Sequence, residues 1–207
     1  MNILIACEFS GIVRDAFRNK GHNAVSCDLL PSEKSGPHLK KDIVEVLVNT
    51  WDEWDMIIAH PPCTFLTVTG NRWFKAEYMH RFPNRQQERN EAIDFFMFLA
   101  EIPIPKIAIE NPIGIMSTYW RKPDQIIQPY WFGDMERKST CLWLKNLPKL
   151  MPTNLVQPSI IKYKTRKGTD DNWHINTIKL PSIERMKERS RTFPGIAKAM
   201  AEQWGSQ

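Results

Sequence analysis

Short apolar runs recur along the chain and alternate with segments whose apolar residues follow helical spacing. Five of these runs predict buried strands, at residues 2–6, 23–30, 56–60, 106–112 and 140–144. Three segments predict helices, at residues 12–20, 86–99 and 193–204. Gly21 is a stop signal for the first helix, and Pro194 suits the first turn of the last. Because strands alternate with helices, we predict an α/β fold with a doubly wound, mostly parallel sheet covered on both faces.

Polar and reactive side chains stand at the ends of four predicted strands. Glu8–Gly11 follows the first strand, Asp28 ends the second, His60–Cys63 follows the third, and Glu110–Asn111 ends the strand at 106–112. Ligands of parallel sheets bind at the carboxyl ends of the strands. The sequence therefore predicts a functional site at one edge of the sheet.

Cys63 and Glu110 are the candidate reactive pair at this edge. Pro61 and Pro62 stiffen the turn that carries the thiol, although a lone cysteine is more often an inert small hydrophobe. Burial beside "KIAI" should raise the pKa of Glu110, so that it holds a proton near neutral pH, unless it caps a helix or pairs with an arginine. A thiolate that adds to C6 of cytosine and an acid that protonates N3 together make C5 a nucleophile toward a methyl group.

A methyl donor needs a pocket of its own. The "EFSG" turn offers backbone N–H groups and a glycine, and Asp28 could accept hydrogen bonds from two ribose hydroxyls. Asp42 could bind an adenine amino group, and it fits equally well as the cap of a helix.

Basic and aromatic residues mark two further regions of the chain. In the stretch after Cys63, basic side chains alternate with rings that could stack on bases, and Gly70 could act as a hinge; a packed surface loop is the alternative. The whole chain carries a net charge of +5, whereas residues 145–191 alone carry +7, with eleven Lys and Arg against four Asp and Glu. This segment indicates a polyanionic partner or a solvated surface.

These motifs together resemble the DNA cytosine-5 methyltransferases, most closely the compact forms of bacteriophages and prophages. "ACEFSGIVRDAFRNKGHNAVSCDL" is similar to the opening cofactor segment of that family, "IIAHPPC" to its nucleophile motif and "IENP" to its Glu-Asn motif. "ERKSTCLWL" and "RSRTFPGIAKAMAEQW" resemble its late basic segment and its C-terminal helix. The match is weakest between residues 146 and 188.

The resemblance implies a Rossmann-like S-adenosylmethionine-dependent methyltransferase fold and a site for flipped cytosine in DNA. Cys63 would be the covalent nucleophile and Glu110 the proton donor, and Arg137 with Lys138 would hold the cytosine carbonyl. The implied cofactor residues are Glu8, Phe9, Ser10, Gly11, Asp28, Leu29, Asp42, Ile43, His60, Pro61 and Ile196. The expected DNA-binding residues are Arg72, Trp73, Lys75, Arg81, Lys162, Lys164, Arg166 and Lys167.

The chain departs from the family pattern at several positions. Gly11 is followed by Ile12 instead of a second glycine, His60 stands where glycine is usual, and Ser139 replaces a second arginine. The segment that would recognise sequence is very short. We therefore expect a short or degenerate recognition site, and a single six-base motif in a modification map of treated DNA would contradict this.

Length and composition set the remaining expectations. The 207 residues suit a catalytic and cofactor-binding domain (1–145), a small irregular basic segment for target recognition (146–188) and a C-terminal helix that packs back (189–207). Four scattered cysteines favour neither a zinc site nor a disulfide framework, and no signal peptide or membrane span is predicted. We expect a cytoplasmic monomer, in the host cytoplasm if a phage encodes it, with no bound metal.

Other functions stay open at this point. The same fold could modify free cytosine nucleotides or use another one-carbon donor, or it could be a DNA-binding relic without activity. Amine methyltransferases carry an aromatic residue where Cys63 stands, and zinc deaminases need a second cysteine at a spacing that is absent here.

Overall fold

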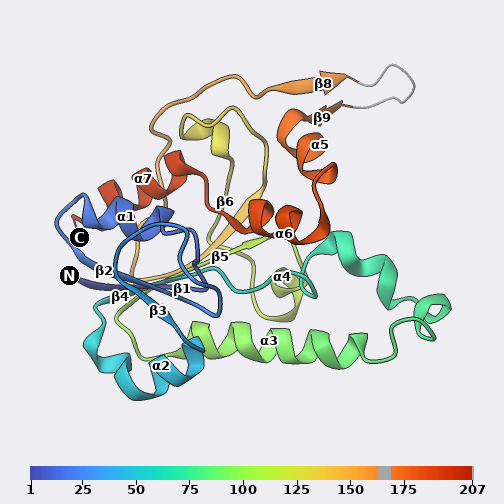
Figure 1. Ribbon diagram of the computed structural model, residues 1–207, viewed down its shortest axis with the longest axis horizontal. Coiled ribbons are helices and arrows are strands. Elements are labelled where there is room, and N and C mark those ends of the chain that lie inside the picture. The colour runs from blue at the N-terminus through green and yellow to red at the C-terminus, as the bar shows by residue number, and fades with distance from the viewer. Residues whose placement is uncertain (163–168, 207) are drawn as a thin grey trace.

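A seven-stranded sheet forms the centre of the molecule, in the order β3-β2-β1-β4-β5-β7-β6 (Figure 1). The computed structural model describes residues 1–162 and 169–206. The strands are β1 (Asn2–Ala6), β2 (Asn23–Asp28), β3 (His38–Lys40), β4 (Met56–Ala59), β5 (Lys106–Pro112), β6 (Gln125–Ile127) and β7 (Thr140–Lys145). Strands β3, β2, β1, β4 and β5 run parallel, and β7 is antiparallel to both β5 and β6.

Helices cover both faces of this sheet. One face carries α1 (Ile12–Arg18) and α7 (Pro194–Trp204), and the other carries α2 (Ile43–Thr50) and α3 (Arg85–Glu101) (Figure 1). The doubly wound, mostly parallel α/β fold predicted from the sequence is confirmed.

The apolar runs form strands because both of their faces are buried. In β1, Ile3 and Ile5 pack with residues of α1 and α7, whereas Leu4 and Ala6 pack with residues of α2 and α3. Successive side chains of a strand point to opposite faces, so a strand covered on both sides reads as a continuous apolar run. Trp204 of α7 is fully buried and fixes the C-terminal helix to the sheet.

All predicted strands and helices are present, but several short elements were missed. β3 and β6 have only three residues each, too few for a periodic pattern. The other α-helices and strands are α4 (Met116–Tyr119), α5 (Asn172–Ile178), α6 (Ser182–Ser190) and the antiparallel pair β8 (Ile160–Lys162) and β9 (Thr169–Asp171). Within residues 1–162 and 169–206, no helix combines the length and apolar character needed to cross a membrane.

Candidate active site

The carboxyl ends of β1, β2, β4 and β5 lie along one edge of the sheet, because these strands are adjacent and parallel. This edge carries the predicted groups Glu8–Gly11, Asp28, His60–Cys63 and Glu110–Asn111. The strand order runs outward from β1 in both directions, so the edge includes the switch point at which such sheets bind ligands. The prediction that these groups share one edge is confirmed.

Cys63 and Glu110 come from neighbouring strands. Cys63 lies in the turn after β4, and Glu110 lies on β5, next to the residue that pairs with Ala59. The side-chain amide of Asn111 donates a 2.7 Å hydrogen bond to the carbonyl of Pro61, which fastens the turn to β5. The thiol and the carboxylate are therefore held at one place by adjacent elements.

The charges around Cys63 act on it in opposite directions. Burial raises the pKa of the thiol, the positive charges of Lys138 and Arg189 lower it, and the negative charge of Glu110 raises it. The net shift is upward, so the substrate-free protein holds mainly the thiol at neutral pH. Arg189 is a neighbour that the sequence analysis missed, because α6 lies in the segment where its patterns are weakest.

Glu110 is buried among donors from three other segments. The Nδ1 atom of His60 lies 2.8 Å from Oε2 of Glu110, and the hydroxyl of Thr192 donates to the same oxygen at 3.3 Å. The His60 and Glu110 side chains are only 7% and 10% exposed. Lys138 adds a positive charge nearby.

The predicted rise in the pKa of Glu110 is wrong for the substrate-free protein. Burial does raise the pKa, but the hydrogen bond from His60, the charges of Lys138 and His60 and the hydrogen bond from Thr192 outweigh it. Together they lower the pKa of Glu110 from 4.5 to about 2. The carboxylate is therefore ionised at neutral pH, and a proton for a substrate must enter the site from elsewhere.

Lys138 and Arg137 precede β7 beside this pair. The Lys138 ammonium donates to the carbonyl of Arg189 at 2.9 Å and lies 5.8 Å from the ring centres of both Trp173 and Phe193. The Nε atom of Arg137 is buried and has no hydrogen-bond partner among the described residues. This N–H group could donate to an oxygen of a ligand. The contact of Arg137 with the carbonyl of cytosine stays a prediction, and Nε is the atom that would make it.

A cavity of about 210 Å³ opens beside the same edge. It is lined by four of the predicted cofactor residues, Asp28, Leu29, Asp42 and Ile43. Five further lining residues were not predicted, namely Cys7, Cys27, Lys41, Pro62 and Phe95. Two carboxylates beside apolar walls match the chemistry of an adenosine group, which offers the two hydroxyls of a ribose and the amino group of a flat adenine ring.

The two carboxylates of this cavity also have structural partners. Asp28 accepts a 2.9 Å hydrogen bond from the amide of Leu30, and Asp42 caps α2 through a 2.8 Å hydrogen bond from the amide of Val44. The capping alternative for Asp42 is confirmed. A carboxylate has about four acceptor positions, so both residues keep capacity for a ligand.

The polar side chains of the "EFSG" turn bind the start of α1 and do not line the 210 Å³ cavity. The Glu8 carboxylate accepts from the amides of Val13 and Arg14 at 2.7 and 3.2 Å, and Ser10 donates to it at 3.2 Å. Gly11 has φ +71°, and a Cβ there would come within 2.5 Å of the Arg14 guanidinium. Glu8, Ser10 and Gly11 therefore lie outside the lining of the 210 Å³ cavity and build the turn beside it.

Other predicted cofactor residues are also held away from this cavity. Ile196 belongs to α7 and is buried in the core. Phe9 is also buried, and Lys187 and Arg191 lie 5.9 and 5.8 Å from the centre of its ring. His60 binds Glu110, and the carbonyl of Pro61 binds Asn111, as described above. For these residues the predicted contacts with a cofactor stay predictions.

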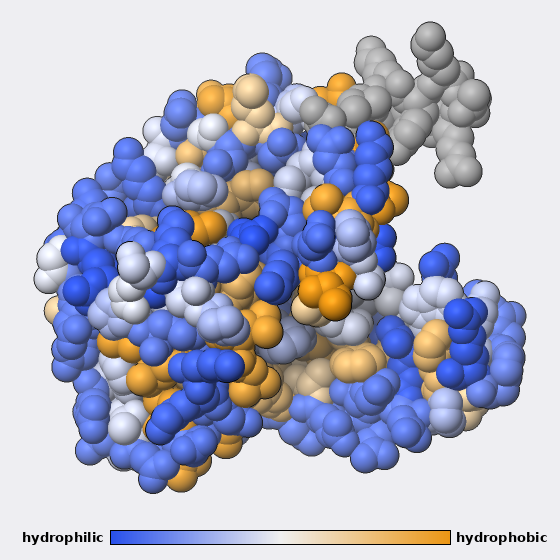
Figure 2. Space-filling view, in the orientation of Figure 1, coloured by the Kyte–Doolittle hydropathy of each residue, from blue (hydrophilic) through white to orange (hydrophobic). Residues whose placement is uncertain are grey.

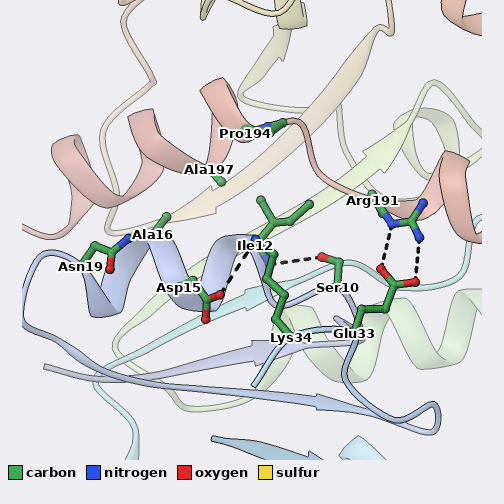
Figure 3. Close-up of a pocket in the computed structure, with 10 residues that line it drawn as sticks. All are labelled: Ser10, Ile12, Asp15, Ala16, Asn19, Glu33, Lys34, Arg191, Pro194 and Ala197. Carbon is green, nitrogen blue, oxygen red and sulfur yellow. Dashed lines mark hydrogen bonds and ion pairs between the residues drawn. The ribbon is translucent and has the colours of Figure 1, made fainter. Parts of the chain in front are cut away.

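A larger cavity of about 580 Å³ lies between α1 and α7 and was not predicted (Figure 3). Figure 3 shows Arg191 paired with Glu33 at its rim, where Nε and Nη2 donate to the two carboxylate oxygens at 3.0 and 2.7 Å. Ser10 also lines this cavity, which places it beside the turn after β1. The sequence held no signal for it, because Glu33 and Arg191 are 158 residues apart.

Residues 64–84 form an arm that extends past the first turn of α3 (Figure 1). Arg72, Lys75 and Arg81 are exposed on it, as a DNA contact requires. Figure 2 shows the molecule hollowed between this arm and the part above that carries α5. Lys162 lies in β8, and the predicted contacts Lys164, Arg166 and Lys167 fall outside the described residues.

The arm is bound to the rest of the protein at its base and packs on itself at its tip. At the base, the Leu66 carbonyl accepts a 2.8 Å hydrogen bond from Ile115, and a Cβ on Gly114 would come within 2.3 Å of that carbonyl oxygen. At the tip, Trp73 packs edge-on against Tyr78 and Phe82. Trp73 is therefore packed within the loop, as the alternative to a DNA contact expects. Stacking of its ring on a base stays a prediction.

Arg89 of α3 holds the arm in place. Its guanidinium donates to the Phe65 carbonyl at 2.9 Å and to the Asn71 side chain at 2.8 Å, and it lies 3.3 Å from the ring centre of Phe74. Each hydrogen bond to a charged group contributes about 1.5–3 kcal/mol. We expect Arg89→Ala to speed amide hydrogen exchange in residues 64–84 by roughly 10- to 100-fold, without a change in β1 or β4.

Arg81→Ala is the matched control for this experiment. Arg81 is exposed on the same arm and has no hydrogen bond with another side chain in the described part of the protein. The control should leave amide exchange unchanged, and equal exchange in the two variants would show that Arg89 does not hold the arm.

Comparisons with known proteins identify the family of this chain neither by sequence nor by structure. No protein-family model matches the chain, and no curated protein matches it. Among solved structures it is similar to a protein encoded within a prophage of E. coli, whose assignment as a DNA modification methyltransferase is provisional. The identity is 15% and the TM-score 0.46, and the match covers 81% of this chain and 62% of that one. The chain thus spans less than two thirds of the matched protein, and a likeness at this level establishes no activity.

Proposed function

We propose that this chain transfers a methyl group from S-adenosylmethionine to C5 of cytosine in DNA. The observation that carries the proposal is the meeting of Cys63, Glu110 and Lys138 at the edge of the sheet that also borders the cavity with Asp28 and Asp42. A nucleophile, a proton-handling carboxylate and a cation are the groups that covalent activation of a pyrimidine requires.

The residues of the chain divide this chemistry among them. The Cys63 sulfur adds to C6 of the base once its proton is lost, and the charges of Lys138 and Arg189 favour that loss. Glu110 donates a proton to N3 of the base. Arg137, whose Nε atom has no partner among the described residues, would donate to the carbonyl oxygen of the base.

The cavity at Asp28 and Asp42 fits the adenosine part of the cofactor because its two carboxylates can accept hydrogen bonds from the donors of adenosine. Asp28 would accept from ribose hydroxyls, Asp42 from the adenine amino group, and Leu29 and Ile43 would cover the ring. When bound, S-adenosylmethionine supplies an electrophilic methyl group.

Asp28→Asn is expected to weaken S-adenosylmethionine binding by roughly 10- to 100-fold. The change removes the charge from an acceptor of two hydroxyl hydrogen bonds, and hydrogen bonds to charged groups contribute about 1.5–3 kcal/mol. Isothermal titration calorimetry measures the dissociation constant. Asp52→Asn, at an exposed carboxylate of the short 3₁₀ helix Trp51–Glu53, should bind the cofactor as the natural protein does.

A substrate comparison tests the function as a whole. The protein is incubated with S-adenosylmethionine labelled in its methyl group and either duplex DNA or dCMP. We expect label at C5 of cytosine in DNA and none in dCMP, because the exposed cations of the arm suit a polyanion. Label in dCMP alone would favour the nucleotide-modifying alternative, and label in neither would contradict the proposal.

A further inference from the structure

The buried pair of His60 and Glu110 has no counterpart in the motif that the chain resembles, where glycine stands before the prolines. His60 is fixed from both sides: its amide donates to the Ala6 carbonyl at 2.9 Å, and Pro61 follows it in the chain. Its Nδ1 atom lies 2.8 Å from the Glu110 carboxylate. This hydrogen bond joins two buried groups that can each hold a proton, so a proton can pass directly from one to the other.

The second ring nitrogen of His60 is the atom through which a proton can enter. Nε2 is buried and has no hydrogen-bond partner among the described residues. In a neutral ring that donates from Nδ1 to Glu110, Nε2 is an unpaired acceptor. A buried acceptor without a donor costs free energy. Protonation of Nε2 makes the His60 ring a cation, which lies against the anionic carboxylate of Glu110.

We propose that the His60–Glu110 pair, and not Glu110 alone, is the acid that protonates N3 of the bound cytosine. The inference rests on the proposed function. His60 is a positioning residue in this scheme, since it holds the proton beside Glu110 and does not touch the base.

In the addition step the Cys63 thiolate, which has already lost its proton, forms a bond to C6. The C5–C6 double bond shifts to C4–C5, the electron pair of the C4–N3 double bond moves to N3, and N3 takes up a proton from Glu110. Glu110 in turn takes the Nδ1 proton of the His60 imidazolium, which leaves a neutral ring. When the bond between C6 and sulfur later breaks, N3 returns its proton to the pair.

Other titratable and charged groups face the pair from every neighbouring element. Lys138 precedes β7, Cys141 lies on β7, and Cys63 lies in the turn after β4. Arg189 of α6 adds a positive charge near Cys63. None of these groups donates a hydrogen bond to the carboxylate in the described structure, so His60 and the Thr192 hydroxyl remain its donors there.

The test is the pH dependence of adduct formation in His60→Asn. The asparagine amide can replace the Nδ1 donor but does not titrate. With a duplex that contains 5-fluorocytosine and with S-adenosylmethionine present, the covalent adduct accumulates, and its rate is followed by gel shift from pH 5 to pH 9. The natural protein and the variant share the same titration of Cys63, so the ratio of their rates isolates the acid.

We expect the variant to be slowed at least about 10-fold at neutral pH, since a general acid contributes about 10²–10⁴-fold. The slowing should be smallest at pH 5 and should grow as the pH rises, because the variant relies on the Glu110 carboxyl alone, whose low pKa leaves an ever smaller fraction protonated. A ratio that is the same at every pH would overturn the inference and assign His60 a structural role only. His60→Gln, which places its amide differently, repeats the test if the first variant fails to fold.

The outcome also separates this inference from the proposed function. If the natural protein forms no adduct at any pH, the proposed function itself fails. If it forms an adduct and His60→Asn forms it at the same rate over the whole range, only the inference fails.

Discussion

Replacement of Cys63 by serine is expected to abolish methyl transfer to duplex DNA, with a loss on the order of 10⁶-fold, as for other covalent nucleophiles. A hydroxyl has the shape of the thiol but a much higher pKa, and the cations near residue 63 cannot ionise it. The measurement is incorporation of labelled methyl groups under single-turnover conditions.

The control is Cys141→Ala, which removes the thiol on β7 opposite Asn111. Burial raises the pKa of Cys141 to about 11, so its loss changes no charge in the site. This variant should retain methyl transfer. Turnover by Cys63→Ser within tenfold of the natural protein would rule out a covalent role for that sulfur.

Replacement of Arg14 by methionine is expected to destabilise the fold by about 3–5 kcal/mol, the range for loss of one partner from a buried charged network. The guanidinium is fully buried and acts as the common donor for five groups, the Asp15 carboxylate, the Ser26 and Ser32 hydroxyls and the Lys34 and Ser35 carbonyls. Methionine fills the space but donates no hydrogen bond, so each of these five acceptors loses the bond from Arg14.

Thermal unfolding measures this loss, with an expected fall in Tm of roughly 10 °C. Arg18→Met is the matched control on the same helix, because Arg18 is exposed and, among the residues that the structure describes, its side chain donates only to the Ala24 carbonyl, at 3.3 Å. Its free energy of unfolding should change by less than about 0.5 kcal/mol. Equal stability of the two variants would mean that the Arg14 network contributes little.

The fold could be predicted because its central strands are buried on both faces. β1, β4 and β5 appear in the sequence as uninterrupted apolar runs, and their parallel arrangement brings Cys63 and Glu110 together. The direction of β7 could not be predicted, since a buried strand has the same pattern in a parallel and an antiparallel neighbour.

The electrostatics of the site could not be predicted, because they depend on residues far apart in sequence. His60 and Thr192 are 50 and 82 residues from Glu110, and these distant donors reverse the rise in pKa that burial alone causes. The hydrogen bonds of Glu8 to the amides of Val13 and Arg14 are local, but the sequence did not predict them, because the family resemblance implied that Glu8 contacts the cofactor.

Mass spectrometry of the protein after incubation with S-adenosylmethionine and a 5-fluorocytosine duplex shows directly whether Cys63 is the covalent nucleophile. We expect one modified peptide, with the methylated base attached to the sulfur of Cys63. A protein recovered without any adduct, or with the base attached to Cys7, Cys27 or Cys141, would contradict it.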